Sequence, residues 1–157
     1  MDSATIIDRY YNLSLRFLSY RPRSEKEMLD YLEKKKLDEK TIAQIIARLG
    51  EYKYIDDTEF AKFWIEQRIK FKHKPIRVIE FELKQKGINK DLIDDVLSKL
   101  EDSKKLDLES AKKLAVKKLD FYRDLDVKKR REKVMSYLLR KGFNYDLVKK
   151  SLEELEP

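Results

Sequence analysis

Few side chains in this sequence could perform chemistry, and the first to consider is its single histidine. His73 lies among cations in the run Lys70–Pro75. No second potential metal ligand stands beside it, and no nearby carboxylate could orient it as a general base. Neighbouring positive charges also disfavour the imidazolium form. We therefore expect no catalytic role for His73.

Asp56 and Asp57 form the one acidic pair that invites a metal-binding or partner-binding interpretation. A helix N-cap is the simpler explanation, because a carboxylate accepts hydrogen bonds from the first free N–H groups of a helix. Glu59 could then complete a capping box. We favour the cap for one of the two residues and keep partner contact open for both.

Glycine and cysteine usage remove further kinds of site. The three glycines are scattered, so they cannot build a loop that cradles phosphates. With no cysteine, the chain can form neither a disulfide nor a thiolate metal site. We predict no metal, no cofactor and no enzymatic activity.

Cations are the more promising groups. The net charge is +7, and Lys and Arg crowd the stretches 68–77 and 128–131. Such runs attract phosphates or acidic protein surfaces, although many are only the solvated face of a helix. Arginine in particular favours bidentate recognition of carboxylate or phosphate. The residues predicted to contact a partner or DNA are Arg21, Arg23, Tyr54, Asp56, Asp57, Arg68, Lys70, Lys72, Lys74, Arg77, Lys86, Arg140 and Lys141.

Aromatic residues around position 60 could instead stack on bases. Phe60 and Trp64 are four residues apart on an apolar helical stripe, which favours a place in the core. Tyr54 precedes that helix and is the better candidate for an exposed contact.

The elements that position these residues are predicted to be all helical. Lys, Glu, Leu, Ile and Arg dominate the composition, and three prolines and three glycines are too few for the turns of a β protein. The 41% of hydrophobic residues permits a packed core despite 43% of charged ones. We predict an all-α protein.

The chain repeats itself. Lys36, Gly87 and Gly142 occupy the same position in three similar segments, 51 residues (36 to 87) and 55 residues (87 to 142) apart. In the second and third segments the pattern is a helix, a glycine, an apolar residue, an asparagine cap and another helix, which predicts a sharp corner. Lys36 should make the first corner strained or differently shaped.

A further helix is expected before each pair, at 4–20, 57–71 and 108–122. The first of these should bury Ile6, Tyr10, Leu13 and Phe17. We therefore predict three tandem three-helix repeats, at 1–53, 54–102 and 107–157, stacked into an elongated, curved body. The polar stretch 102–107 should be a linker and the place of any bending.

Features of targeting are not evident. The first residues lack a basic segment followed by an apolar one, and no stretch approaches the roughly 20 apolar residues that span a bilayer. We expect a cytoplasmic protein with no membrane association, and a monomer.

Four segments resemble the RecX regulators of bacteria. They are Leu18–Glu27 with Tyr31–Lys35, Tyr54–Ala61 with Arg68, Glu82–Ile88, and Tyr137–Phe143. The sequence departs from the family at Lys36 and at His73-Lys74-Pro75, where relatives often carry a glycine before the proline. The resemblance implies a modulator of RecA in recombination, DNA repair and the SOS response. It further implies that the protein binds the RecA–single-stranded-DNA filament and most often inhibits it.

Two other interpretations stay open. Three helices with a sharp second corner also describe a helix-turn-helix DNA binder without RecA involvement. Against it, the would-be recognition helix after Asn89 exposes Asp91, Asp94 and Asp95, which would repel a duplex. Weak nonspecific binding of single- or double-stranded DNA is compatible with the charge. A purely structural helical adaptor is the second alternative.

Overall fold

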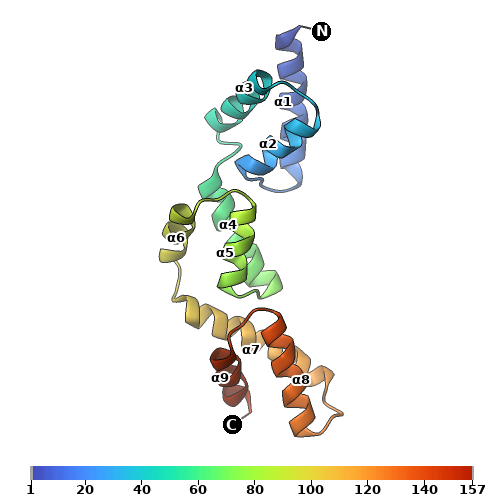
Figure 1. Ribbon diagram of the computed structural model, residues 1–157, viewed down its shortest axis with the longest axis vertical. Helices are drawn as coiled ribbons and strands as arrows, with labels where there is room; N and C mark the ends of the chain where they lie inside the picture. Colours follow the sequence, from blue (N-terminus) through green and yellow to red (C-terminus); the bar gives the residue numbers. More distant parts are fainter. Residues whose placement is uncertain (1, 157) are drawn as a thin grey trace. The chain divides into compact units, whose positions relative to one another are not determined.

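Nine α-helices and no strand make up residues 2–156, the part of the chain that this computed structural model describes (Figure 1). The all-α prediction is confirmed. The helices are α1 (Ser3–Tyr20), α2 (Glu25–Lys34), α3 (Glu39–Glu51), α4 (Asp57–Lys72), α5 (Ile76–Gln85), α6 (Lys90–Ser98), α7 (Ser103–Phe121), α8 (Val127–Arg140) and α9 (Tyr145–Leu155).

Side-chain caps define where the helices begin. Ser24 accepts from the backbone N–H of Glu27, and the Glu27 side chain accepts in return from Ser24, so the predicted capping box of α2 is present. Asn89 and Asn144 accept from the backbone of Leu92 and Leu147, each at 2.8 Å, and cap α6 and α9 as predicted.

The three corners all turn through a residue with positive φ. Gly87 and Gly142 have φ of +84° and +103°, and Lys36 has φ of +60°. The first corner is strained, as expected, because a lysine adopts a left-handed conformation only at a cost in free energy that glycine avoids. It also differs in its hydrogen bonds: Ile88 and Phe143 donate from their backbone to Leu83 and Leu138, at 3.0 and 3.3 Å, and no such bond is found at the first corner among the described residues.

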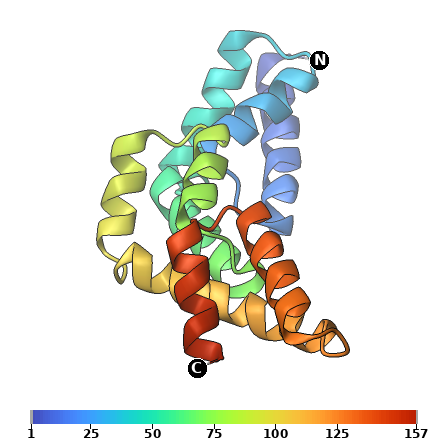
Figure 2. The ribbon, with the colours of Figure 1, turned by 60° about the horizontal axis from the view of Figure 1, so that its bottom comes forward.

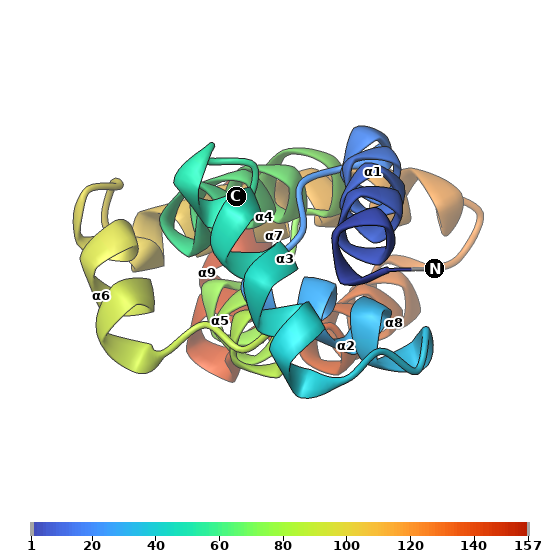
Figure 3. The same ribbon diagram turned by 90° about the horizontal axis from the view of Figure 1, so that it is seen from above.

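The chain divides into two compact units. Unit 1 comprises Met1–Phe63 and Leu83–Ile93, and unit 2 comprises Trp64–Glu82 and Asp94–Pro157. The core of unit 1 gathers buried residues from α1, α2 and α3, helices that Figure 3 shows from above, and from the segment before α4. They are Tyr11, Met28, Leu32, Ile42, Ile45, Leu49 and Ile55.

Unit 2 has a core of its own between α7, α8 and α9 (Figure 2). It contains Ala111, Leu114, Ala115, Val134, Leu138, Phe143, Val148 and Leu152. In the segment between these two clusters, Phe60 and Trp64 are 1% and 6% exposed, which confirms their predicted place in the core. The repeat bounds 1–53, 54–102 and 107–157 stay a prediction.

The buried face of α1 is centred slightly away from the predicted one. Its fully buried residues are Tyr11 and Ser14, whereas the predicted Ile6, Tyr10, Leu13 and Phe17 are half-buried, with Tyr10 and Phe17 packed against the core. The buried hydroxyl of Ser14 is satisfied because it donates to the carbonyl of Tyr10 at 2.7 Å. A polar residue can thus occupy an inward position that hydrophobic periodicity assigns elsewhere.

The predicted linker 102–107 is helical instead. Helix α7 begins at Ser103, and Asp102 caps it by accepting from the backbone N–H of Lys104 at 3.0 Å. Asp107 is then held by a hydrogen bond from the backbone of Ile76, at 2.9 Å. The polar residues of this stretch therefore cap a helix and form a tertiary hydrogen bond, and do not form a flexible linker.

No helix of the described residues is long and apolar enough to cross a membrane.

Candidate partner-binding surfaces

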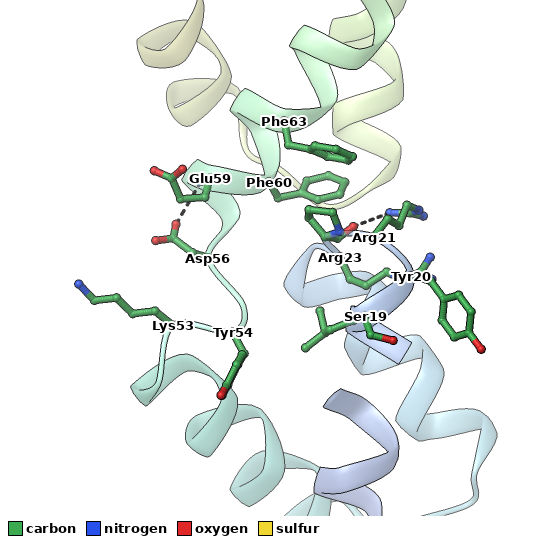
Figure 4. A pocket seen from close by; sticks show the side chains of 12 residues that line it. Ser19, Tyr20, Arg21, Arg23, Lys53, Tyr54, Asp56, Glu59, Phe60 and Phe63 are labelled. Atoms are coloured by element: carbon green, nitrogen blue, oxygen red, sulfur yellow. Dashed lines mark hydrogen bonds between the residues drawn. The ribbon is translucent and has the colours of Figure 1, made fainter. Parts of the chain in front are cut away.

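An open pocket of about 630 Å³ lies in unit 1, between the end of α1, the turn before α2 and the start of α4 (Figure 4). We call it the tyrosine–arginine pocket. Its lining residues are Leu18, Ser19, Tyr20, Arg21, Pro22, Arg23, Lys53, Tyr54, Asp56, Glu59, Phe60 and Phe63. Four predicted contact residues, Arg21, Arg23, Tyr54 and Asp56, therefore share one surface.

Two tyrosines give this pocket exposed aromatic area. Tyr20 is 75% exposed and Tyr54 is 53% exposed, the latter as predicted. Figure 4 shows Phe60 and Phe63 pointing from α4 toward the segment that carries Arg21 and Arg23. Exposed tyrosines beside arginines are the side chains that most often dominate protein–protein binding.

Arg21 is held rigidly within an ionic cluster. Its guanidinium forms a bidentate pair with Glu27, and Nη1 also donates to the carbonyl of Pro22 at 2.8 Å. Lys86 joins from the second repeat, with Nζ 3.6 Å from Oε2 of Glu27. Two cations thus converge on one half-buried carboxylate, whose side chain is 14% exposed.

The same cluster sets the ionisation of Glu27. Burial raises its pKa, but hydrogen bonds from Arg21 and Ser24 and the charges of Arg21 and Lys86 outweigh burial. The net result is a pKa below the usual value for glutamate.

Glu27→Gln should lower the free energy of unfolding by about 2 kcal/mol at neutral pH, since charge-assisted hydrogen bonds are lost. Because the folded-state pKa of Glu27 is depressed, its contribution is fully present above the unfolded pKa and is lost as pH falls through the folded value. The difference between wild type and variant should therefore shrink between about pH 5 and pH 3. Urea unfolding at a series of pH values measures it.

Glu33→Gln is the matched control for that prediction, because Glu33 is an exposed residue of the same helix. It should change stability little at any of these pH values. A constant stability gap between wild type and the Glu27 variant across the acid range would contradict the cluster's role.

The Arg23 guanidinium contacts the backbone carbonyl and the aromatic ring of Phe17, and no carboxylate of the described residues. Its Nε and Nη2 donate to the carbonyl of Phe17 at 3.4 and 3.3 Å, and its guanidinium lies 3.8 Å from the centroid of the Phe17 ring. That ring stacks in turn on Tyr31, at 4.2 Å. Burial lowers the pKa of Arg23, and the nearby charge of Arg21 lowers it further. Arg23 is therefore preorganised at the pocket wall.

The acidic pair serves two different helices. Asp56 accepts from the backbone of Thr58 and Glu59, at 3.0 and 3.3 Å, and caps α4 as predicted. Asp57 accepts from the backbone N–H of Glu25 at 2.9 Å, which the sequence did not indicate. Both carboxylates are engaged by helix N-termini, and residues 2–156 contain no group of three or more potential ligands that could hold a metal ion.

In unit 2, one glutamate neutralises part of the predicted 68–77 cation run. The Glu82 carboxylate forms ion pairs with Nε of Arg68 and with Nζ of Lys74, each at 3.1 Å. The Arg68 guanidinium also lies 4.0 Å from the centroid of the Trp64 ring. Lys70 is exposed, with Nζ 5.5 Å from the centroid of the Phe71 ring.

Four predicted contact residues of unit 2 line a second pocket, of about 240 Å³, which we call the cationic pocket. It combines the turn between α4 and α5 with the start of α5 and the end of α8. Its lining residues are Lys72, His73, Lys74, Pro75, Val78, Arg140 and Lys141. Four of the predicted contact residues therefore come together here from two distant stretches of sequence.

A close approach between two helices holds the walls of the cationic pocket together. Nη2 of Arg77 donates to the carbonyl of Gly142 at 3.0 Å. A Cβ added to Gly142 would lie 2.8 Å from Cγ2 of Val78, so only a glycine admits this approach. Arg77 is thereby a structural partner of the corner as well as a surface cation.

Sequence reasoning missed several residues of these surfaces. Tyr20 is the most exposed aromatic of the tyrosine–arginine pocket and was not singled out. Phe71, which is 61% exposed, and Val78, which lines the cationic pocket, also went unnoticed. An apolar residue next to cations was the available signal for Phe71, whereas nothing local distinguishes Val78.

Comparison with known families assigns all three parts of the chain. Residues 11–49, 56–97 and 106–152 match the first, second and third three-helix domains of RecX, in that order.

Individual proteins agree with these domain matches. The chain is 33% identical to the regulatory protein RecX of Oceanobacillus iheyensis over 159 residues, covering 99% of this chain and 57% of the relative. It is 41% identical to RecX of Streptococcus pyogenes over 145 residues, covering 92% of this chain and 54% of the relative. The chain thus spans little more than half the length of these relatives.

Solved structures are similar over a larger share. A crystal structure of RecX from Lactobacillus salivarius superposes with a TM-score of 0.78 at 31% identity, covering 98% of both chains. A second crystal structure, of a regulatory protein RecX, gives a TM-score of 0.76 at 29% identity and covers 94% of this chain and 73% of the other.

Proposed function

This chain belongs to the RecX family of regulatory proteins, and from that premise we propose that it binds the RecA–single-stranded-DNA filament and limits RecA activity. The single observation that carries the proposal is the ordered match of all three domains across residues 11–152. Such regulation would act in recombination, DNA repair and the SOS response, as the family resemblance implies.

The tyrosine–arginine pocket is the surface that we propose contacts RecA. Tyr20 and Tyr54 offer large amphipathic area, and a tyrosine loses little conformational freedom on binding. Arg21 and Arg23 are already oriented by Glu27 and by Phe17, so little further ordering cost arises when a partner docks. A preorganised, partly aromatic pocket favours a protein surface over a small polar ligand.

A filament of identical protomers makes even weak contacts effective. A protein that carries more than one contact surface gains effective concentration once the first has bound, provided that both can engage. Regulation at amounts well below one chain per RecA protomer would follow from this avidity.

A helix-turn-helix mode on duplex DNA has less support. Helix α6 exposes Asp91, Asp94 and Asp95, and α9 exposes Glu153 and Glu154. Carboxylates on a recognition helix would face the phosphates that flank the major groove.

RecA ATPase on single-stranded DNA tests the proposal. RecA proteins from Oceanobacillus iheyensis and Streptococcus pyogenes, the sources of two relatives, provide suitable targets. Adding this chain substoichiometrically should lower the steady-state rate and shorten filaments seen by electron microscopy. The proposal fails if neither rate nor filament length changes with either RecA at any ratio.

A further inference from the structure

The ionic cluster of Arg21, Glu27 and Lys86 in unit 1 and the cationic pocket in unit 2 occupy corresponding places in the repeats. Lys26 in unit 1 donates through Nζ to the carbonyl of Gln85 at 3.2 Å, and its counterpart 51 residues on, Arg77 in unit 2, donates to the carbonyl of Gly142 at 3.0 Å. A second shared feature is the aspartate bond to the start of a helix, Asp57 to the N–H of Glu25 and Asp107 to that of Ile76, both 2.9 Å. In each unit the corner of one repeat therefore packs on the helix that begins the pair in the repeat before it. The bonded residues do not all correspond, because Arg140 stands 55 residues after Gln85 and Leu108 stands 51 residues after Asp57.

One position breaks the equivalence. With the same offsets of 51 and 55 residues, Arg21 corresponds to Lys72, Lys86 to Lys141, and Glu27 to Val78. In unit 1, Arg21 and Lys86 converge on the Glu27 carboxylate. In unit 2, Lys72 and Lys141 line the cationic pocket together with Val78, which brings no charge. Both units therefore have cations at these two positions, but unit 2 has a hydrocarbon side chain where unit 1 has the carboxylate.

The resulting charge is not neutralised by other groups. Lys72, Arg140 and Lys141 form no ion pair with any carboxylate of residues 2–156. Lys74 alone is paired, with Glu82 at 3.1 Å. Uncompensated cations around a concave surface focus a positive potential and attract an anion.

His73 provides a polar group in the same pocket. Its φ of +50° places it in the left-handed region, and its Nδ1 is buried with no hydrogen-bond partner among the described residues. Burial lowers the pKa of the imidazole, the nearby backbone of Ile69 opposes this, and the charges of Lys113 and Lys117 on α7 lower it further. An anion in the pocket would offset the positive charges that lower this pKa.

We propose that the cationic pocket binds a phosphate group of a single-stranded nucleic acid, which takes the place that the Glu27 carboxylate holds in unit 1. A phosphodiester, like a carboxylate, presents two equivalent oxygens, so Lys72 and Lys141 can both donate to one group. The inference goes beyond the proposed function, because it requires no RecA.

Phe71 is the reason to prefer a nucleic acid over an acidic peptide. The ring is 61% exposed, directly precedes Lys72 in the sequence, and has the ammonium of Lys70 5.5 Å from its centroid. An exposed aromatic ring beside a track of cations is the combination that proteins use to hold unpaired bases and their backbone. An acidic peptide could pair with the cations, but its carboxylates would make no stacking contact with the Phe71 ring.

Two substitutions at Val78 test the site directly. Val78→Glu places a carboxylate where unit 1 has Glu27, and this carboxylate should pair with the cations of the pocket. Val78→Gln introduces a side chain of nearly the same shape as glutamate but without its charge. Fluorescence anisotropy with labelled oligo(dT) should show about tenfold weaker binding for Val78→Glu, with the salt slope reduced by about 0.7 for each phosphate that the protein no longer neutralises. Val78→Gln should stay within about twofold of wild type, since the phosphate-binding cations are intact. Circular dichroism verifies that both variants fold.

Substitutions elsewhere in unit 2 separate the pocket from overall charge. Arg140→Gln with Lys141→Gln removes two charges from the end of α8, and the control, Lys128→Gln with Lys129→Gln, removes two exposed charges from the start of the same helix. Only the first pair should weaken binding strongly. Phe71→Leu should cost about fivefold or more, because base stacking on an aromatic ring is lost.

The single histidine reports on the pocket without RecA or activity. By NMR, the pKa of His73 should rise when oligo(dT) is added to wild type, since an anion favours the imidazolium among Lys72, Lys74, Lys113, Lys117, Arg140 and Lys141. In Val78→Glu it should already be raised and should not respond further. Equal affinities of the two Val78 variants, oligo(dT) binding without a change at His73, or equally strong competition by oligoglutamate would each overturn the proposal. RecA inhibition that survives such a result would leave the proposed function standing.

Discussion

The double variant Tyr20→Ala, Tyr54→Ala should lose the ability to inhibit RecA at substoichiometric amounts. Both rings are largely exposed at the rim of the tyrosine–arginine pocket, so the fold does not depend on them. Truncation of a central aromatic in an interface typically costs about 2 kcal/mol or more, which corresponds to roughly 30-fold in affinity. Titration of the RecA ATPase rate against added protein measures the shift in half-inhibiting concentration.

Tyr52→Ala is the matched control for this experiment. Tyr52 is 62% exposed and only two residues from Tyr54, but it does not line the pocket. It should inhibit RecA as well as wild type does. Equal potency of the double variant and the control would show that RecA binds another face, and equal losses in both would point to a nonspecific aromatic effect.

Gly142→Ala should destabilise the protein by about 2–4 kcal/mol, since a strained backbone and an overpacked contact are combined. At φ of +103° the glycine has a conformation that residues with a side chain rarely adopt. The new Cβ would also meet Cγ2 of Val78 at 2.8 Å, so the Val78 side chain or the backbone would have to shift. Urea unfolding followed by circular dichroism measures the change.

Gly50→Ala, in contrast, should raise the free energy of unfolding. Gly50 lies in α3, and a Cβ there would have no neighbouring atom within 4 Å. Replacing a helical glycine by alanine should therefore stabilise by about 0.5–1 kcal/mol.

The Val78→Ala background then separates the two costs at Gly142. Removing Cγ2 should recover the steric part of the destabilisation and leave the backbone part. A destabilisation of the same size in both backgrounds would show that the close approach to Val78 contributes nothing.

Local signals predicted the helices and their ends well. Capping by Ser24, Asn89 and Asn144 depends on hydrogen bonds that span three residues, so the sequence window that forms them is also the one that reveals them. The buried pair Phe60 and Trp64 followed from helical spacing for the same reason. The linker prediction failed because the polar residues of 102–107 act through a cap and a hydrogen bond from Ile76, which is 31 residues away from Asp107.

Local sequence signals could not predict which cations have a carboxylate partner. Arg68 and Lys74 are neutralised by Glu82, and Arg21 and Lys86 by Glu27, whereas Lys72 and Lys141 have no carboxylate partner among the described residues. All six were candidates on equal terms in the sequence. Salt bridges between repeats join residues up to 59 positions apart, so composition and run length carry no information about them.

By itself, the sequence determined the helical class and the three-fold repetition, because caps, periodic apolar residues and corner glycines act over a few residues. Its resemblance to the RecX family rested on four segments, and the comparisons confirmed it. Only the tertiary structure decided which tyrosines and cations share a surface and where an anion is missing. The physical reason is that charge compensation depends on distance in space: one valine in place of a glutamate changes a closed ionic cluster into a pocket that can accept a ligand.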